Sequence, residues 1–148
     1  MCNLLNTFIT ALSLTLGATA AHAAEFSCDI ANKGRSVTLT LSGQTVSYAY
    51  GKKGAAPELA LTVPISAVEL YAWEGFGRTP SYSIGVPNGQ YLYTVYTAWD
   101  KIDHTEFAGV NVEKNEKLLT QLQCDVSTVD GDLEKMVLEL KARESDNK

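Results

Sequence analysis

The residues best suited to catalysis or metal binding gather around His104, the one histidine beyond residue 22. Asp100, Asp103 and Glu106 lie close to it in the sequence. A nucleophilic triad needs a histidine that an acid orients and that reaches a serine, and no motif here marks a serine as a nucleophile. Zinc takes further histidine or cysteine ligands at recognised spacings, and these are missing. We therefore interpret this stretch as a solvated polar loop, and predict a protein that is not an enzyme and has no metal or cofactor.

Two other groups of acids have an equally simple interpretation. Asp130 and Asp132 flank a glycine, as in a calcium-binding loop, but the acids at alternate positions that such a loop uses are absent. A turn followed by a helix cap explains them better. Paired carboxylates hydrolyse sugars, but Glu69 and Glu74 lie on or beside an aromatic strand, and we interpret them as outward-facing acids that keep an exposed face soluble.

Aromatic residues beside charged ones give a stronger functional signal. Trp73, Phe76 and Arg78 lie among glycines in one loop, and Trp99 precedes a second loop. Exposed Trp, Tyr and Arg side chains carry much of the binding energy in protein interfaces, and aromatic planes also stack on sugar rings. The alternative is an aromatic plug at one end of a barrel, covered by Arg78. The predicted contact residues are Trp73, Glu74, Phe76, Arg78, Trp99, Asp100 and Asp103.

Most of the chain alternates apolar and polar residues with period two, which predicts antiparallel strands with one buried face. Near the C-terminus the period changes: Leu133, Met136, Val137 and Leu140 fall on one face of a helix, expected over about 131–143. We predict a mainly β fold of about eight antiparallel strands with one C-terminal α-helix. The expected strands cover 37–41, 46–50, 59–63, 67–73, 82–86, 91–97, 107–112 and 118–124.

The N-terminal segment predicts export. An apolar run ends in small residues that include Ala21-His22-Ala23, which fits the A-x-A site of a signal peptidase. We expect residues 1–23 to be a cleaved signal peptide and 24–148 to be a single domain. The mature chain then keeps Cys28 and Cys124, which we expect to form one disulfide in an oxidising compartment. This link would tie the two edges of the sheet, so we predict a small barrel, with a two-sheet sandwich as the alternative.

The charge pattern narrows the class of partner. The net charge of −5 lies wholly in the mature chain, which argues against nucleic acid and anionic membrane surfaces and favours a basic protein partner. Polar residues interrupt the N-terminal apolar run, so we expect no stable membrane anchor. The compact export signal and single disulfide favour the periplasm.

The layout resembles that of small periplasmic β-barrel proteins that inhibit lysozyme in Gram-negative bacteria. The shared elements are a signal peptide, the opening Phe26-Ser27-Cys28, an antiparallel barrel, and Cys124 near the end of the last strand. The C-type inhibitors carry a Ser-Gly-x-x-Tyr loop. Here Ser42-Gly43 is followed by Val46 where the tyrosine belongs, so no inhibitory residue is carried over.

The resemblance, together with the similar design of periplasmic immunity proteins, implies a non-enzymatic function. We expect a binding protein that inhibits or neutralises a basic cell-wall hydrolase or a delivered toxin. The alternative is a carrier of a small apolar or sugar ligand inside the barrel.

Overall fold

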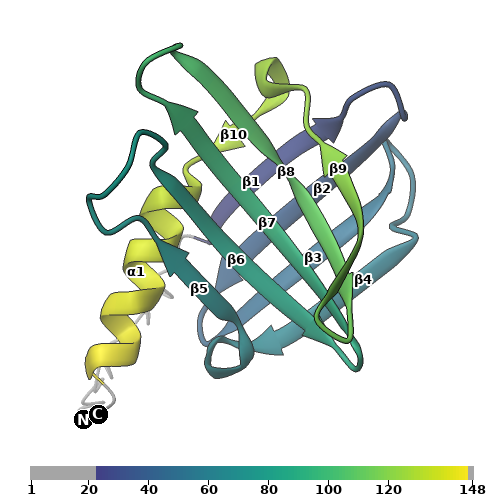
Figure 1. Ribbon diagram of the computed structural model, residues 1–148. Coiled ribbons are helices and arrows are strands. Elements are labelled where there is room, and N and C mark those ends of the chain that lie inside the picture. Colours follow the sequence, from purple (N-terminus) through teal and green to yellow (C-terminus); the bar gives the residue numbers. More distant parts are fainter. Residues whose placement is uncertain (1–22, 147–148) are drawn as a thin grey trace, which may run out of the picture.

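The computed structural model describes residues 23–146. Two five-stranded antiparallel sheets and one C-terminal helix make up the fold (Figure 1). The first sheet has the order β10-β1-β2-β3-β4, and the second has the order β5-β6-β7-β8-β9. The elements are β1 (Ala24–Ile30), β2 (Arg35–Ser42), β3 (Thr45–Lys52), β4 (Leu59–Pro64), η1 (Ile65–Ala67), β5 (Glu69–Ala72), β6 (Ser81–Asn88), β7 (Tyr91–Asp100), β8 (Thr105–Lys114), β9 (Lys117–Gln123), η2 (Val126–Thr128), β10 (Asp130–Gly131) and α1 (Leu133–Asp146).

The alternating pattern produces the strands for the expected reason. In β2, Val37, Leu39 and Leu41 are buried, whereas Thr38 and Thr40 between them are only partly covered. Successive side chains of a strand point to opposite faces, so each sheet turns one apolar row inward. The predicted mainly β fold with a C-terminal helix is confirmed, with the short β10 and β1 raising the number of strands to ten.

The prediction of a closed barrel is wrong, and the arrangement is sandwich-like. At one seam, β4 ends at Pro64 and the η1 turn separates it from β5, so the two strands do not pair. Proline has no N–H to donate to a sheet ladder. At the other seam, the described residues join β1 to the end of β9 through a single bridge between Ile30 and Cys124. Hydrophobic alternation is the same in both architectures, so the sequence pattern did not distinguish them.

The predicted disulfide is present at this second seam. Cys28 and Cys124 are bonded, their Cα atoms are 5.8 Å apart, and both side chains are buried. Beside the bond, the backbone N–H of Asp125 donates to the carbonyl oxygen of Asp29 over 2.8 Å. The covalent link and the backbone hydrogen bonds therefore hold the two sheets together at one corner.

Gly131 lies at the end of β10, just before the helix begins. Gly131 pairs with Phe26 of β1 and has a φ of +90°, and a Cβ at this position would overlap the carbonyl oxygen of Glu25. The helix begins at Leu133 and ends at Asp146, whereas the sequence placed it at about 131–143. Asp132 caps it: its Oδ1 accepts from the N–H of Lys135 over 2.9 Å.

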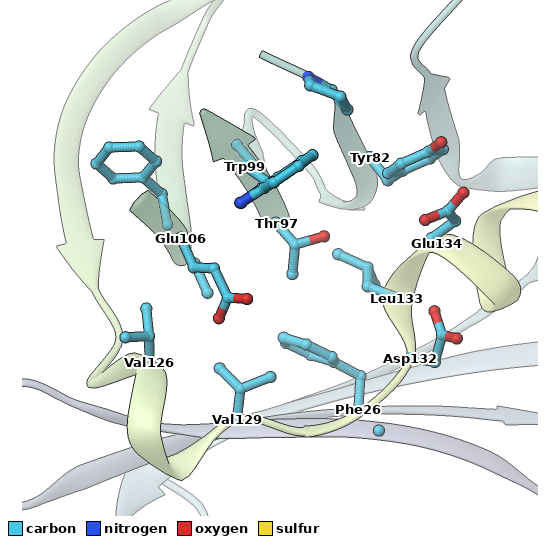
Figure 2. A pocket seen from close by; sticks show the side chains of 15 residues that line it. Phe26, Tyr82, Thr97, Trp99, Glu106, Val126, Val129, Asp132, Leu133 and Glu134 are labelled. Carbon is cyan, nitrogen blue, oxygen red and sulfur yellow. The ribbon is translucent and has the colours of Figure 1, made fainter. Parts of the chain in front are cut away.

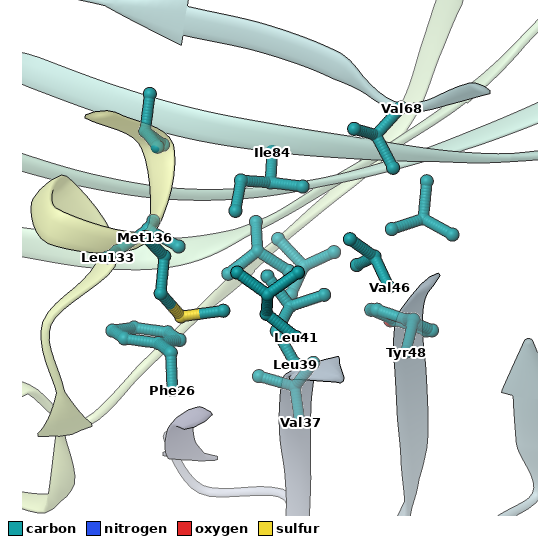
Figure 3. Packing of buried hydrophobic residues seen from close by; sticks show 14 of the residues in the cluster. Phe26, Val37, Leu39, Leu41, Val46, Tyr48, Val68, Ile84, Leu133 and Met136 are labelled. Carbon is teal, nitrogen blue, oxygen red and sulfur yellow. The ribbon is translucent and has the colours of Figure 1, made fainter. Parts of the chain in front are cut away.

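The helix completes the core between the sheets. Its predicted apolar face is buried, and Figure 3 shows Met136 lying over the ring of Phe26, with Ile84 of β6 nearby. Leu138, which the pattern placed off this face, is 49% exposed. The interior of the sandwich is filled by side chains. The fully buried large residues are Tyr48, Phe26, Leu39, Ile84, Leu133, Met136, Leu140, Val37, Val46, Val86, Val95 and Val110.

The predicted signal peptide lies outside the described residues except for Ala23. Between residues 23 and 146, no helix has the length and apolar character needed to cross a membrane.

Candidate functional site

The two loops that hold the predicted contact residues lie side by side at one end of the second sheet (Figure 1). The first, residues 73–80, joins β5 to β6, and the second joins β7 to β8. The N–H of Trp99 donates to the carbonyl oxygen of Pro80, and that of Lys101 donates to Arg78, each over 3.0 Å. These backbone bonds fasten the first loop to the β7–β8 hairpin.

An ion-pair cluster reinforces this attachment. The Arg78 guanidinium donates to the Asp100 carboxylate, with Nε 2.9 Å from Oδ2, and also reaches Asp103 over 2.7 Å. The other oxygen of Asp100 accepts from the backbone N–H groups of Ile102 and Asp103. The hydrogen bonds from Arg78 and then from the Asp103 backbone lower the pKa of Asp100 to about 2. Three of the predicted contact residues therefore bind one another and fix the two loops.

The aromatic residues of these loops divide into a supporting and an exposed group. The indole N–H of Trp73 donates to the carbonyl oxygen of Phe76, and the Lys101 ammonium lies 4.0 Å from the centroid of the Trp73 ring. The Phe76 side chain itself is 85% exposed, and Ile102 in the second loop is 64% exposed. Trp73 thus shapes the loop, while Phe76 and Ile102 project apolar surface into solvent.

The remaining predicted residues are Glu74 and Trp99. Glu74 is exposed, and its side chain has no hydrogen bond or ion pair to the rest of the described chain. Trp99 is 40% exposed, and its ring centroid lies 5.9 Å from that of His104. Trp99 also lines a pocket that the sequence did not reveal.

This pocket, about 390 Å³ in volume, lies at the same end of the molecule (Figure 2). Strands of the second sheet form one wall, and the segment from η2 to the start of α1 forms another. A pocket of this size is within the range of small-ligand sites. Its lining residues are Phe26, Pro80, Tyr82, Thr97, Ala98, Trp99, Glu106, Phe107, Ala108, Val126, Val129, Gly131, Asp132, Leu133 and Glu134.

The strand register explains why polar residues reach this pocket. Thr97 pairs with Ala108, and Trp99 pairs with Glu106, so these residues continue the inward rows that contain the buried pair Val95 and Val110. Alternation along β8 carried this signal: an acid occupies a position that points inward. Because Glu106 follows His104 closely, the sequence analysis placed it in the polar loop instead.

The pocket is acidic. Its lining contains three carboxylates, and no Lys or Arg is among the described residues that line it. Asp132 caps the helix, and Glu134 accepts a hydrogen bond from Tyr82, which together with burial raises the pKa of the Tyr82 hydroxyl. The Glu106 carboxylate has no hydrogen bond or ion pair within the described part of the chain.

The surrounding segments carry a net charge that is more negative than that of the whole chain. Residues 73–80, 99–107 and 125–134 together hold eight carboxylates and two cations, a net charge of −6, whereas the whole chain has −5. All three segments contribute to the pocket. We call this region the acidic end.

Within residues 23–146, no group of three or more His, Cys, Asp or Glu side chains is placed to hold a metal ion. Searches of known protein families, curated proteins and solved structures found no match to this chain.

Proposed function

We propose that this chain is an exported, non-enzymatic binding protein whose acidic end docks against a basic protein and inhibits or neutralises it. A cell-wall hydrolase or a delivered toxin is the expected kind of partner. The observation that carries this proposal is the coincidence, at one end of the fold, of exposed apolar side chains and a net charge of −6.

The apolar component supports docking to a protein. Phe76, Ile102, Trp99 and Phe107 are each at least 40% exposed. Phe76 and Ile102 lie in the β5–β6 and β7–β8 connections, and Trp99 and Phe107 lie at the adjoining ends of β7 and β8. Single exposed apolar side chains are ordinary, but a group of large ones rimmed by charges is typical of interaction sites. Aromatic residues are also enriched among those that dominate binding energy.

The rigidity of the loops supports the same function. The Arg78–Asp100 pair, the backbone bonds to Pro80 and Arg78, and the Trp73 indole bond all hold the loops before any partner arrives. A preorganised loop loses less conformational entropy on binding. Arg78, Asp100 and Asp103 therefore support the surface, while Phe76, Glu74 and Trp99 are available for contact.

The small-ligand carrier remains a second candidate because of the pocket of about 390 Å³. The ligand would have to lie in this end pocket, because side chains fill the space between the sheets. The charge and exposed apolar surface extend well beyond the pocket and favour a macromolecular partner.

A binding panel tests the proposal. The secreted protein is immobilised and exposed to basic cell-wall hydrolases and basic toxins at low and high salt. We expect binding to at least one member, with association that slows as salt rises. A variant with Phe76→Ser and Ile102→Ser should lose most of this affinity, whereas the control Leu138→Ser, exposed on the helix, should retain it.

Two results would contradict the proposal. One is the absence of binding across the panel. The other is binding that the Phe76→Ser and Ile102→Ser changes leave unaltered, because the acidic end would then not be the contact surface.

A further inference from the structure

We infer that the pocket at the acidic end receives an arginine side chain of the basic partner, with the guanidinium stacked on Trp99 and bound to Glu106. This inference rests on the proposed function and names the chemistry that the site recognises. It follows from the register of two strands, the composition of the pocket wall and the charge of its lining.

Trp99 and Glu106 are direct neighbours across the β7–β8 ladder, so their side chains leave the same face of the sheet. This is the inner face, and it remains accessible at this end, since Trp99 is 40% exposed and Glu106 is exposed. Figure 2 shows the Glu106 side chain extending into the pocket, on the same side as Trp99. An aromatic plane and a carboxylate therefore lie together at the mouth of an open cavity.

The pocket walls suit an aliphatic chain. Val126 and Val129 line one side, and Trp99 contributes the other, with Val126 and Trp99 each about two-fifths exposed. Covering this surface with the methylene groups of a long side chain would remove it from water, which favours binding.

The charges of the lining favour a cation. The Glu106 carboxylate is unpaired within the described residues, and Asp132 and Glu134 add further negative potential nearby. The N-terminus of α1 also reaches the pocket, but Asp132 already accepts one of its free N–H groups. An anionic ligand would meet three carboxylates and no basic side chain, so we exclude it.

Among cations, arginine matches this arrangement best. Its planar guanidinium stacks on an aromatic ring and donates several hydrogen bonds to a carboxylate at the same time. Lysine has a compact, strongly hydrated charge and cannot stack in this way. Adjacent Trp99 and Glu106 side chains offer both parts of the arginine interaction.

An NMR titration tests the inference without the partner. The probe is N-acetyl-arginine amide, and N-acetyl-citrulline amide serves as the neutral analogue of the same shape. The indole N–H signal of Trp99 reports the pocket, and that of Trp73, which donates to the Phe76 carbonyl outside the pocket lining, is the internal reference. We expect Trp99 to shift in a saturable way with the arginine probe and much less with citrulline.

Matched variants identify the carboxylate. Glu106→Gln should weaken binding of the arginine probe by about 1.4- to fivefold, the range for a solvent-accessible ion pair. Glu113→Gln, on the same strand but outside the pocket, makes the same change of charge and should leave binding unaltered. Equal binding of the two probes, an unaffected Glu106→Gln variant, or no shift at Trp99 would overturn the inference.

The titration tests the pocket inference and the partner panel tests the proposed function, and a negative result in one can be distinguished from a negative result in the other. If the arginine probe does not bind but a basic protein does, the pocket inference is wrong and the proposed function stands. If the probe binds and no basic protein does, the proposed function is wrong and the pocket is a site for small guanidinium compounds.

Discussion

Breaking the disulfide should remove a large part of the stability of this fold. Cys28 and Cys124 are 96 residues apart in the sequence, so the bond closes a loop that runs from β1 to the end of β9. In the chain-entropy model, a cross-link that closes a loop of about 100 residues stabilises the folded state by about 4.7 kcal/mol, because it restricts the unfolded chain. Domains of this size have total stabilities of about 5–15 kcal/mol.

The test compares three samples by urea unfolding, followed by circular dichroism. They are the oxidised protein, the same protein reduced with a thiol reagent, and a variant with Cys28→Ala and Cys124→Ala. We expect the free energy of unfolding to fall by about 4–5 kcal/mol on reduction. The double variant should lose at least as much, because both sulfur atoms are buried and alanine leaves part of their volume empty.

The reduced wild type separates the two causes, since it keeps the sulfur atoms in the core and lacks only the bond. A thiol assay on the unfolded oxidised protein should find no free thiols at these two positions. Reduction that changes the free energy of unfolding by less than about 1 kcal/mol would refute the loop-closure argument.

Two further predictions concern the loops and the helix. Hydrogen bonds from Arg78 hold the pKa of Asp100 at about 2, below its ordinary value of 3.8. The stability that the ionised Asp100 contributes through these bonds is therefore complete above about pH 4 and is lost as the pH falls toward 2. Asp100→Asn should make the free energy of unfolding less dependent on pH between 4 and 2 in acid titrations followed by urea unfolding, and a variant with unchanged pH dependence would show that the pair contributes nothing. Leu140 is 1% exposed between the helix and the sheets. The change Leu140→Ala should therefore lower the free energy of unfolding by about 2–5 kcal/mol. Leu138→Ala on the exposed face is the control, and its free energy of unfolding should stay within about 0.5 kcal/mol of the wild-type value. Equal effects of the two changes would mean that the helix is not packed as described.

The sequence predicted local structure well because local structure here depends on alternation and spacing. The buried residues Val37, Leu39 and Leu41 identify β2, and the four apolar residues of α1 identify its buried face. The closure of the sheets depends on contacts between distant segments. Pro64 and the η1 turn decide it at one seam, and nothing in the alternating pattern indicates that β4 and β5 fail to pair.

The pocket was missed for a related reason. Its second wall is the irregular segment 125–132, which has no periodicity from which its position over the end of the sandwich could be inferred. Glu106 did carry a signal, because it continues the inward row of Ala108 and Val110. That signal becomes meaningful only when the register with Trp99 is known, and register between strands is not a property of one strand alone.

The structure also changes which substitutions can test binding. Arg78 and Asp100 were grouped with the contact residues because charged and aromatic side chains mark interfaces, yet they lie 22 residues apart and bind each other. Replacing either one would release the loop that carries Phe76, so a loss of affinity would not distinguish a lost contact from a displaced loop. Phe76 and Glu106 have side chains without hydrogen bonds to the described chain, so their substitution removes surface chemistry and leaves the supporting bonds in place. A loss of affinity in those two variants, with the free energy of unfolding unchanged, is the result that would assign binding to the acidic end.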